Sequence, residues 1–248
     1  MDHFIGRLSN FFRAAEGGSA LPVQAEDPGV IRETINYIAR RIDLIGELML
    51  EHLWLVIIAI VIAVVVSVVV GIIISYYERS AQAVLWLCQI LMVIPSLAML
   101  AFMVPLFGIG FTTGVVALIL YSLLPVVRNT YTGIRELSPA IIEAAKGMGM
   151  TEWRILTKIK IPLAMPVIMA GIRTATVMVV GIAAIAAYVG AGGLGELIFQ
   201  GISRANEPMI IAGAIGVSII ALTFDFLMNW GEKRLAAAGK PGGGQNND

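Results

Sequence analysis

The sequence predicts an all-α integral membrane protein with about five transmembrane helices. Of its 248 residues, 58% are hydrophobic and only 14% are charged, whereas soluble domains carry about a quarter charged residues. Several apolar segments are close to the roughly 20 residues that a helix needs to cross the hydrocarbon core. They cover residues 53–75, 84–106, 113–131, 164–189 and 208–229. Apolar surface on this scale must face lipid.

The residues before the first apolar segment are of two kinds. Residues 1–28 are polar and interrupted by glycine and proline, so we expect a flexible N-terminal segment. Residues 29–51 repeat isoleucine at helical spacing, with charged residues largely off that face, which predicts an amphipathic helix. Such a helix either lies in the membrane interface or packs on the transmembrane bundle, and both placements fit the pattern.

Residues 52–231 form the predicted transmembrane domain, and prolines interrupt two of its spans. Pro95 and Pro105 fall in the second span and Pro125 in the third. A proline inside a span frees a backbone carbonyl that a neighbouring helix or water must satisfy. We therefore expect these positions to face the bundle or a pathway. Residues 232–248 end in a low-complexity, glycine-rich run, which predicts a disordered tail.

Basic residues predict the orientation. They gather between the third and fourth spans, at Arg128, Arg135, Lys146, Arg154, Lys158 and Lys160. Positive residues accumulate on the cytoplasmic side, so the loop over 136–162 is expected to be cytoplasmic. Five spans then place the C-terminus inside and the N-terminus outside, although Arg40 and Arg41 argue against the latter. The formal net charge of zero excludes bulk attraction to nucleic acid.

No constellation of residues points to catalysis or metal binding. The chain has two histidines and one cysteine, no paired carboxylates in the predicted spans and no P-loop sequence. We therefore expect no catalytic residue, no metal site and no cofactor, with any ATP bound by a partner. Residues 190–195 match the G-x-G-x-x-G spacing, but a predicted span precedes them instead of a strand. A flexible turn at the outer mouth is the better interpretation.

Arg173 is a lone basic residue inside the fourth span. A lipid-facing arginine there would cost on the order of 2.5–3.5 kcal/mol or more, so it must face the bundle, a subunit interface or water. Asp225, in the last turns of the fifth span, is the acidic residue that can partner it. The two form either a structural ion pair or part of a gate.

Three aromatic residues near the predicted pathway are Phe102, Tyr121 and Tyr188. Aromatic faces attract quaternary ammonium groups through cation–π contact. Ordinary packing or anchoring at the membrane interface is the better explanation for any one of them.

The loop over 136–162 predicts two short helices. Ser138, followed by proline, suits a helix start with the hydroxyl as N-cap, and Gly149 suits the turn after it. Thr151 is placed to cap a second helix over 152–160, which Pro162 is expected to end because the residue before a proline leaves the helical region.

Residues 143–162, EAAKGMGMTEWRILTKIKIP, resemble the EAA loop of ABC importer permeases. That pattern reads E-A-A, three residues, G, nine residues, then I-x-L-P. The chain departs from it only in an isoleucine for the leucine, a volume-conserving change. In the family this loop binds in a groove on the ATPase subunit. The alternative without a specific function is an ordinary amphipathic cytoplasmic loop. The resemblance implies ATPase coupling by Glu143, Ala144, Ala145, Gly149, Trp153, Ile159, Ile161 and Pro162.

Longer strings are similar to one subfamily, the permease subunits of osmoprotectant importers for glycine betaine, choline, carnitine or proline betaine. They are IPSLAMLAFMVPLFGIG (94–110), YSLLPVVRNTYTGI (121–134), PVIMAGIRTAT (166–176) and GAGGLGELI (190–198). The resemblance implies a type I ABC importer of the methionine-permease-like fold, in the bacterial inner membrane. The chain itself would not be an enzyme.

The same resemblance implies the partners. They are two copies of an ABC ATPase, a second permease that is this chain or a close paralogue, and a separate extracytoplasmic substrate-binding protein, besides membrane lipid. One alternative is a permease for amino acids or another small solute. Another is a membrane scaffold that recruits a cytoplasmic partner without transporting anything. The proline-broken spans and Arg173 favour a pathway, since a scaffold needs neither.

Overall fold

The computed structural model describes residues 28–238, and every regular element in that range is helical. Four of its helices are long and apolar enough to cross a membrane, or five if one bent pair counts as a span. The expected all-α membrane fold is thereby confirmed. The expected flexible residues 1–27, and residues 239–248 of the expected tail, lie outside the described residues.

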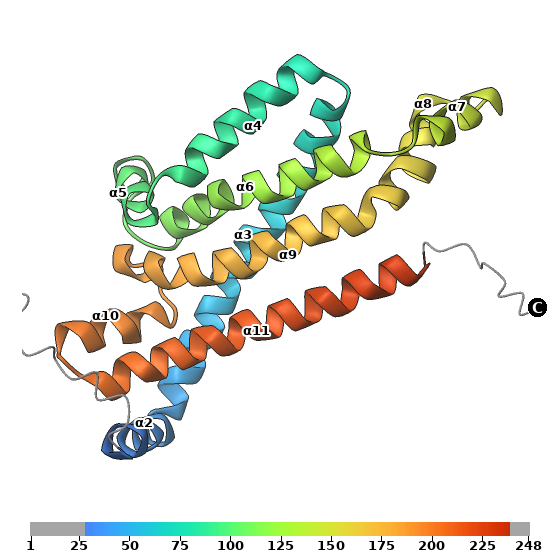
Figure 1. Cartoon of the computed structure of the whole chain (residues 1–248). Helices are drawn as coiled ribbons and strands as arrows, with labels where there is room; N and C mark the ends of the chain where they lie inside the picture. The colour runs from blue at the N-terminus through green and yellow to red at the C-terminus, as the bar shows by residue number, and fades with distance from the viewer. Residues whose placement is uncertain (1–27, 239–248) are drawn as a thin grey trace, which may run out of the picture.

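The elements follow one another as Figure 1 shows. In chain order they are α2 (Pro28–Arg40), α3 (Ile42–Ser75), α4 (Glu78–Val93), α5 (Ser96–Phe107), α6 (Phe111–Arg135), α7 (Pro139–Gly147), α8 (Glu152–Ile155), the π-helical turn η1 (Leu156–Lys160), α9 (Ile161–Ala186), the 3-10 turn η2 (Ala187–Val189), α10 (Gly195–Ser203) and α11 (Glu207–Ala238).

The core lies where α3, α6 and α9 pack together. α6 packs against both α3 and α9, and α11 covers α9 from the other side. Fully buried side chains from separate elements meet there, among them Leu55, Leu100, Leu118, Val179 and Leu194. Close packing of branched apolar residues fixes the helices relative to one another.

The predicted second span is not one straight helix. α4 and α5 meet at an angle of 101°, because Pro95 holds Ile94 in an extended conformation (φ −61°, ψ 128°) that ends α4. The carbonyl freed at this elbow is satisfied from α6, since the buried Tyr121 donates its hydroxyl to the Ile94 oxygen.

The predicted amphipathic helix is shorter than residues 29–51. α2 ends at Arg40, and residues 42–51 form the first turns of α3, a continuous helix of 34 residues that is about 51 Å long. α2 lies across the end of the bundle opposite α7 and α8 (Figure 1). It packs on α11 yet leaves Ile31 and Ile35 about 60% exposed, so it combines both expected placements.

The C-terminal end of the domain also differs from the expectation. α11 continues through residues 232–238, which were assigned to the disordered tail. Within this extension the guanidinium of Arg234 lies 4.7 Å from the centre of the Trp230 ring. Such cation–π contact helps to hold the last turns.

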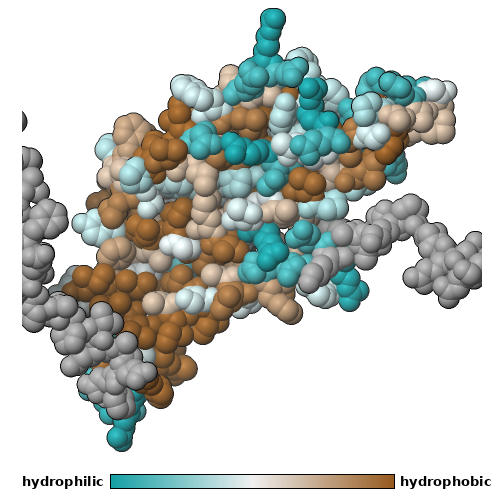
Figure 2. Space-filling view, in the orientation of Figure 1, coloured by the Kyte–Doolittle hydropathy of each residue, from teal (hydrophilic) through white to brown (hydrophobic). Residues whose placement is uncertain are grey.

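Large apolar side chains cover the outward faces of α3 and α11. Figure 2 shows hydrophobic residues over much of the visible surface of α10 and α11. The most exposed include Val61, Val65, Val69 and Ile73 on α3, and Ile219, Leu222 and Phe226 on α11. Soluble monomers rarely expose contiguous apolar patches of this extent, so these faces suit lipid.

The two ends of the bundle are expected on opposite sides of the membrane. Cys88 is the only cysteine, so a Cys88→Ser background allows single-cysteine labelling with a membrane-impermeant maleimide. Asn36→Cys, on α2, should be labelled in right-side-out vesicles, and Met148→Cys, beside α7, only in inside-out vesicles. Leu118→Cys, in the core, serves as an unlabelled control. The reverse pattern would contradict the orientation.

Candidate functional site

The predicted cytoplasmic loop forms a knuckle of two short helices, α7 and α8, that projects from one end of the bundle (Figure 1). Thr151 caps α8 as expected, because its hydroxyl oxygen accepts the Arg154 N–H at 3.4 Å. Ser138 is the N-cap residue of α7 but makes no side-chain capping bond. The start of α7 instead relies on the proline in its first turn, whose fixed φ suits a helix.

The second helix of the knuckle does not end at Pro162. A π-helical turn, η1, runs from α8 directly into α9, and the Ile161 N–H bonds to the Leu156 carbonyl. This wider turn admits a proline, which has no N–H and clashes with the carbonyl four residues back. Lys160 in η1 also places its ammonium 4.5 Å from the ring centre of Tyr76, at the end of α3. The knuckle is therefore continuous with α9.

The predicted coupling residues differ in exposure. Glu143, Ala144, Gly149, Trp153 and Pro162 are exposed, Ile159 and Ile161 are half-buried, and Ala145 is buried. Trp153 and Met148 are 71% and 74% exposed, and Ile141 of α7 is 43% exposed. Exposed large apolar side chains of this kind mark protein contact sites. Met148 was missed in the sequence, where its only signal is its place between two glycines.

An ion pair ties the two helices of the knuckle together. The Lys146 ammonium lies 2.8 Å from the Glu152 carboxylate, and Gly149 makes the turn between them at φ +76°. The hydrogen bond and charge of Lys146 lower the pKa of Glu152, and Glu152 raises the pKa of Lys146. Both groups are thus fully charged, and the ion pair contributes in full, at pH values between their ordinary pKa values. It is lost as pH falls through the lowered carboxyl pKa or rises through the raised ammonium pKa. Exposure keeps its contribution small.

Arg173 and Asp225 meet between α9 and α11. The guanidinium donates Nε–H to Oδ1 at 2.7 Å and an Nη2–H to Oδ2 at 3.0 Å, the bidentate arrangement that favours arginine. Glu232 adds a second carboxylate 3.7 Å from Nη1. Sequence reasoning missed Glu232 because it had placed that residue in the tail. These three residues, the ion triad, border a hollow of about 450 Å³.

The ion triad is only partly enclosed by the chain. The Arg173 and Asp225 side chains are 33% and 38% exposed, although both lie within helices long enough to span the membrane. Charged groups at such depth do not face lipid without a large penalty. This face of α9 and α11 must therefore be covered by protein or water in the membrane.

The three pathway aromatics have separate surroundings. Phe102, on α5, is 70% exposed, and Tyr188, in η2, is 64% exposed with Phe199 at 5.4 Å between ring centres. Tyr121 is only 3% exposed and bonds to the elbow at Ile94. Its ring is buried in this arrangement, which leaves Phe102 and Tyr188 as the two of these three rings that are open to a solute.

The glycine-rich turn at 190–195 lies at the end of the bundle opposite the knuckle, between η2 and α10. Glu51 of α3 accepts the Gly193 N–H at 3.0 Å, and the buried His52 donates from Nε2 to the Val180 carbonyl at 3.1 Å. Gly193 has φ +88°, and a Cβ there would lie 3.0–3.1 Å from His52. The sequence indicated the turn but not that α3 holds it.

These features define a class of protein. It is a helical membrane subunit in which one span is bent at a proline, two short helices project from one end, and a glycine-rich turn at the other end is hydrogen-bonded to α3. Residues 67–237 match the family model of the binding-protein-dependent transport system inner membrane component. The chain belongs to this family of transport permeases. It is therefore a membrane permease subunit rather than an enzyme, and it works with an ATPase and a substrate-binding protein.

Two relatives are similar along most of their length. The chain is 42% identical over 200 residues to the glycine betaine/carnitine/choline transport system permease protein OpuCB of Bacillus subtilis, covering 79% of this chain and 92% of that protein. It is 44% identical over 202 residues to the osmoprotectant import permease protein OsmW of Salmonella typhimurium, covering 79% and 94%.

The fold is similar to that of a permease of known structure. An inward-facing structure of the MetNI methionine ABC transporter matches with a TM-score of 0.70 at 21% identity, over 82% of this chain and 99% of that chain. At this identity the likeness concerns the fold alone. It confirms the type I ABC importer architecture that the sequence predicted.

Breaking the ion triad is expected to destabilise the protein in a coupled way. Arg173→Ala leaves two carboxylates without a cation inside the membrane, and Asp225→Ala removes the bidentate acceptor. Each single variant should lower the temperature of thermal aggregation in detergent by several degrees, and the double variant by less than the sum. Lys146→Ala, which breaks an exposed pair, is the control and should change little. Strictly additive effects would contradict the coupling.

Proposed function

We propose that this chain is the permease of an ATP-driven importer for a small quaternary-amine osmoprotectant such as glycine betaine, choline or carnitine. The observation that carries this proposal is the similarity to permeases whose names specify these solutes, at 42% identity for one of them and over most of its length. The exposed rings of Phe102 and Tyr188 are compatible with a cationic solute, since aromatic faces attract quaternary ammonium.

In the proposed assembly, two permeases sit on two copies of the ATPase. The second permease is this chain or a close paralogue. The half-exposed ion triad supports such a pairing, because a second permease, or a water-filled pathway between the two, would cover the charged face of α9 and α11. The substrate-binding protein would deliver the solute on the opposite side from the ATPases.

Coupling to the ATPase would run through the knuckle. The exposed Trp153 and Met148 suit seating in a groove of the partner, where buried aromatic anchors supply most of the binding energy. Closure of the ATPase dimer on ATP would then bias the permease between inward-open and outward-open states. η1 passes the movement on, since it joins α8 to α9 without a break.

The substrate class is tested by uptake into proteoliposomes that contain the permease, its ATPase and its binding protein. Labelled glycine betaine should accumulate only with ATP inside, and unlabelled choline or carnitine should compete whereas methionine should not. Uptake of methionine in place of betaine would show an amino-acid importer. A complex that moves neither solute but still binds its ATPase would favour the scaffold.

The coupling role is tested on the knuckle. Trp153→Ala and Met148→Ala should each lower ATP-driven uptake by about tenfold or more, the usual effect of losing an interface anchor, and Glu143→Lys should do the same. Membrane insertion should remain normal. Leu222→Ala, which trims a side chain 69% exposed on α11, is the matched control. Normal uptake in all three knuckle variants would refute the role.

A further inference from the structure

Several arginines lie at the end of the bundle opposite the knuckle. Arg32 and Arg40 are on α2, Arg41 joins α2 to α3, and Arg204 follows α10. With the knuckle in the cytoplasm, this is the outer side, where the positive-inside rule makes basic residues rare. In the sequence, Arg40 and Arg41 argued against an outer location of the N-terminus. The structure places them at the outer end all the same, which suggests that they have a function there.

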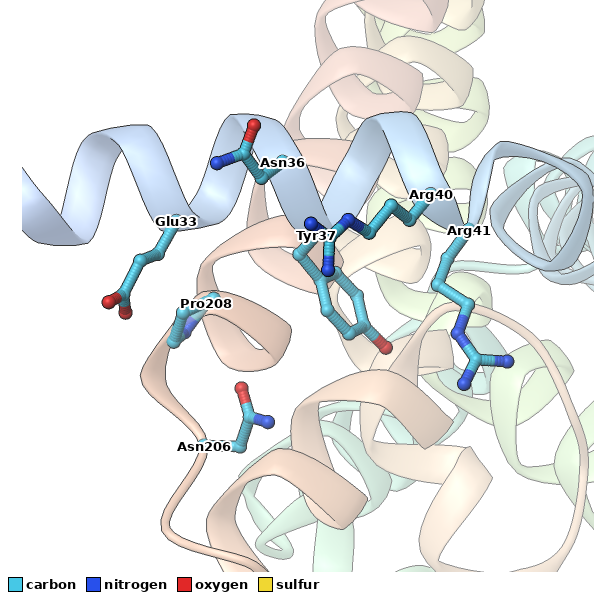
Figure 3. A pocket seen from close by; sticks show the side chains of 7 residues that line it. All are labelled: Glu33, Asn36, Tyr37, Arg40, Arg41, Asn206 and Pro208. Atoms are coloured by element: carbon cyan, nitrogen blue, oxygen red, sulfur yellow. The ribbon is translucent and has the colours of Figure 1, made fainter.

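Arg40 and Arg41 line a hollow between α2 and the turn that leads into α11. Its volume is about 490 Å³, and its other lining residues are Glu33, Asn36, Tyr37, Asn206 and Pro208. In Figure 3 the side chains of Tyr37 and Arg41 extend from α2 and its junction with α3 toward the side of Asn206, whereas that of Arg40 runs back along α2 and ends beside Tyr37. The far wall is well fixed, because the side-chain oxygen of Asn206 accepts the Met209 N–H at 3.1 Å and caps α11.

The charges of the two arginines are available to a ligand. Both residues are exposed, and no carboxylate of residues 28–238 lies within ion-pair distance of either. Glu33 also lines the hollow, but it precedes Arg40 by about two helical turns, or roughly 10 Å along the axis. Arg204, Glu207 and Glu33 line the adjoining hollow. Arg40 and Arg41 thus share their hollow with one carboxylate, that of Glu33, and form an ion pair with no carboxylate of residues 28–238.

The hollow opens toward water rather than lipid. At 100° per residue, Glu33 and Arg40 lie on the side of α2 opposite Ile31 and Ile35. Those two isoleucines are 62% and 61% exposed and form the face that suits lipid. A ligand that enters the hollow therefore comes from the aqueous phase outside the membrane.

We propose that this hollow is a landing site for the substrate-binding protein, through surface carboxylates that pair with Arg40 and Arg41. The inference rests on the proposed function, and the family description itself implies such a protein. Guanidinium groups bind carboxylates in a bidentate, directional way, and paired charges at an interface rim guide both encounter and register. α2 precedes the residues matched by the family model, 67–237, whereas Asn206 and Pro208 on the opposite wall of the hollow lie within them.

The test uses the complete importer in lipid nanodiscs, with ATPase activity measured while purified, betaine-loaded cognate binding protein is titrated. Arg40→Glu/Arg41→Glu should raise the concentration for half-maximal stimulation by about tenfold or more. The basal rate and the rate at saturation should not change. Arg40→Gln/Arg41→Gln should give a smaller shift in the same direction. Arg32→Glu, the same change on α2 but outside the hollow, is the matched control. It should shift the concentration for half-maximal stimulation by less than about twofold.

Salt provides a second readout. Raising ionic strength from about 0.05 to 0.3 M should weaken binding to the wild-type complex more than to the glutamine variant, since screening acts on the exposed charges. An unchanged half-maximal concentration in both double variants would overturn the proposal. So would a defect that disappears in nanodiscs without anionic phospholipid, because a lipid headgroup would then be the ligand. A wild-type complex that no binding protein stimulates would instead refute the proposed function.

Discussion

The structure depends on one constraint: inside a membrane, every backbone polar group needs a partner from the protein or from water, because lipid offers none. Three departures from regular helix within residues 28–238 meet that requirement through contacts in the protein. The proline elbow after α4 is closed by the Tyr121 hydroxyl, and the turn before α10 is held by Glu51 at the Gly193 N–H. The π-helical turn before Pro162 keeps its backbone hydrogen bonds because each N–H bonds to the carbonyl five residues back instead of four. In the first two places a neighbouring element supplies the partner, and in the third the helix supplies it by widening its own turn.

The same reasoning extends to charge. Arg173 is retained within a span because two carboxylates surround it, and the face they leave exposed points to further protein or water. Arg40 and Arg41 have no such partner among the described residues and lie instead in a hollow that opens outward. The two sites avoid the cost of burying a charge in different ways. In the ion triad the charges pair within the chain, whereas Arg40 and Arg41 remain exposed to water. That contrast separates a structural cluster from an interaction surface.

Sequence reasoning succeeded where the signal is local. Apolar length located the spans, clustered basic residues located the knuckle, and Thr151 marked the start of α8. It failed where a residue depends on a distant partner. Neither the place of Tyr121 beneath the elbow nor the role of Glu51 at the glycine turn is visible in spacing, since the partners are 27 and 142 residues away. Glu232 was missed for another reason, because a helical extension resembles a tail when only composition is considered.

α9 links the two ends of the molecule through contacts with the same neighbour. Near its start, Lys160 stacks on Tyr76 at the end of α3. Near its far end, the Val180 carbonyl bonds to His52 in the first turns of α3, and the following Val189 carbonyl accepts the Gly110 N–H at 2.9 Å. A displacement of the knuckle therefore strains the contact at Tyr76, at the end of α3, together with the one at His52 about three turns into α3, and also the turn between α5 and α6. Because packed helices move as rigid elements, these contacts are where an inward-open and an outward-open arrangement must differ.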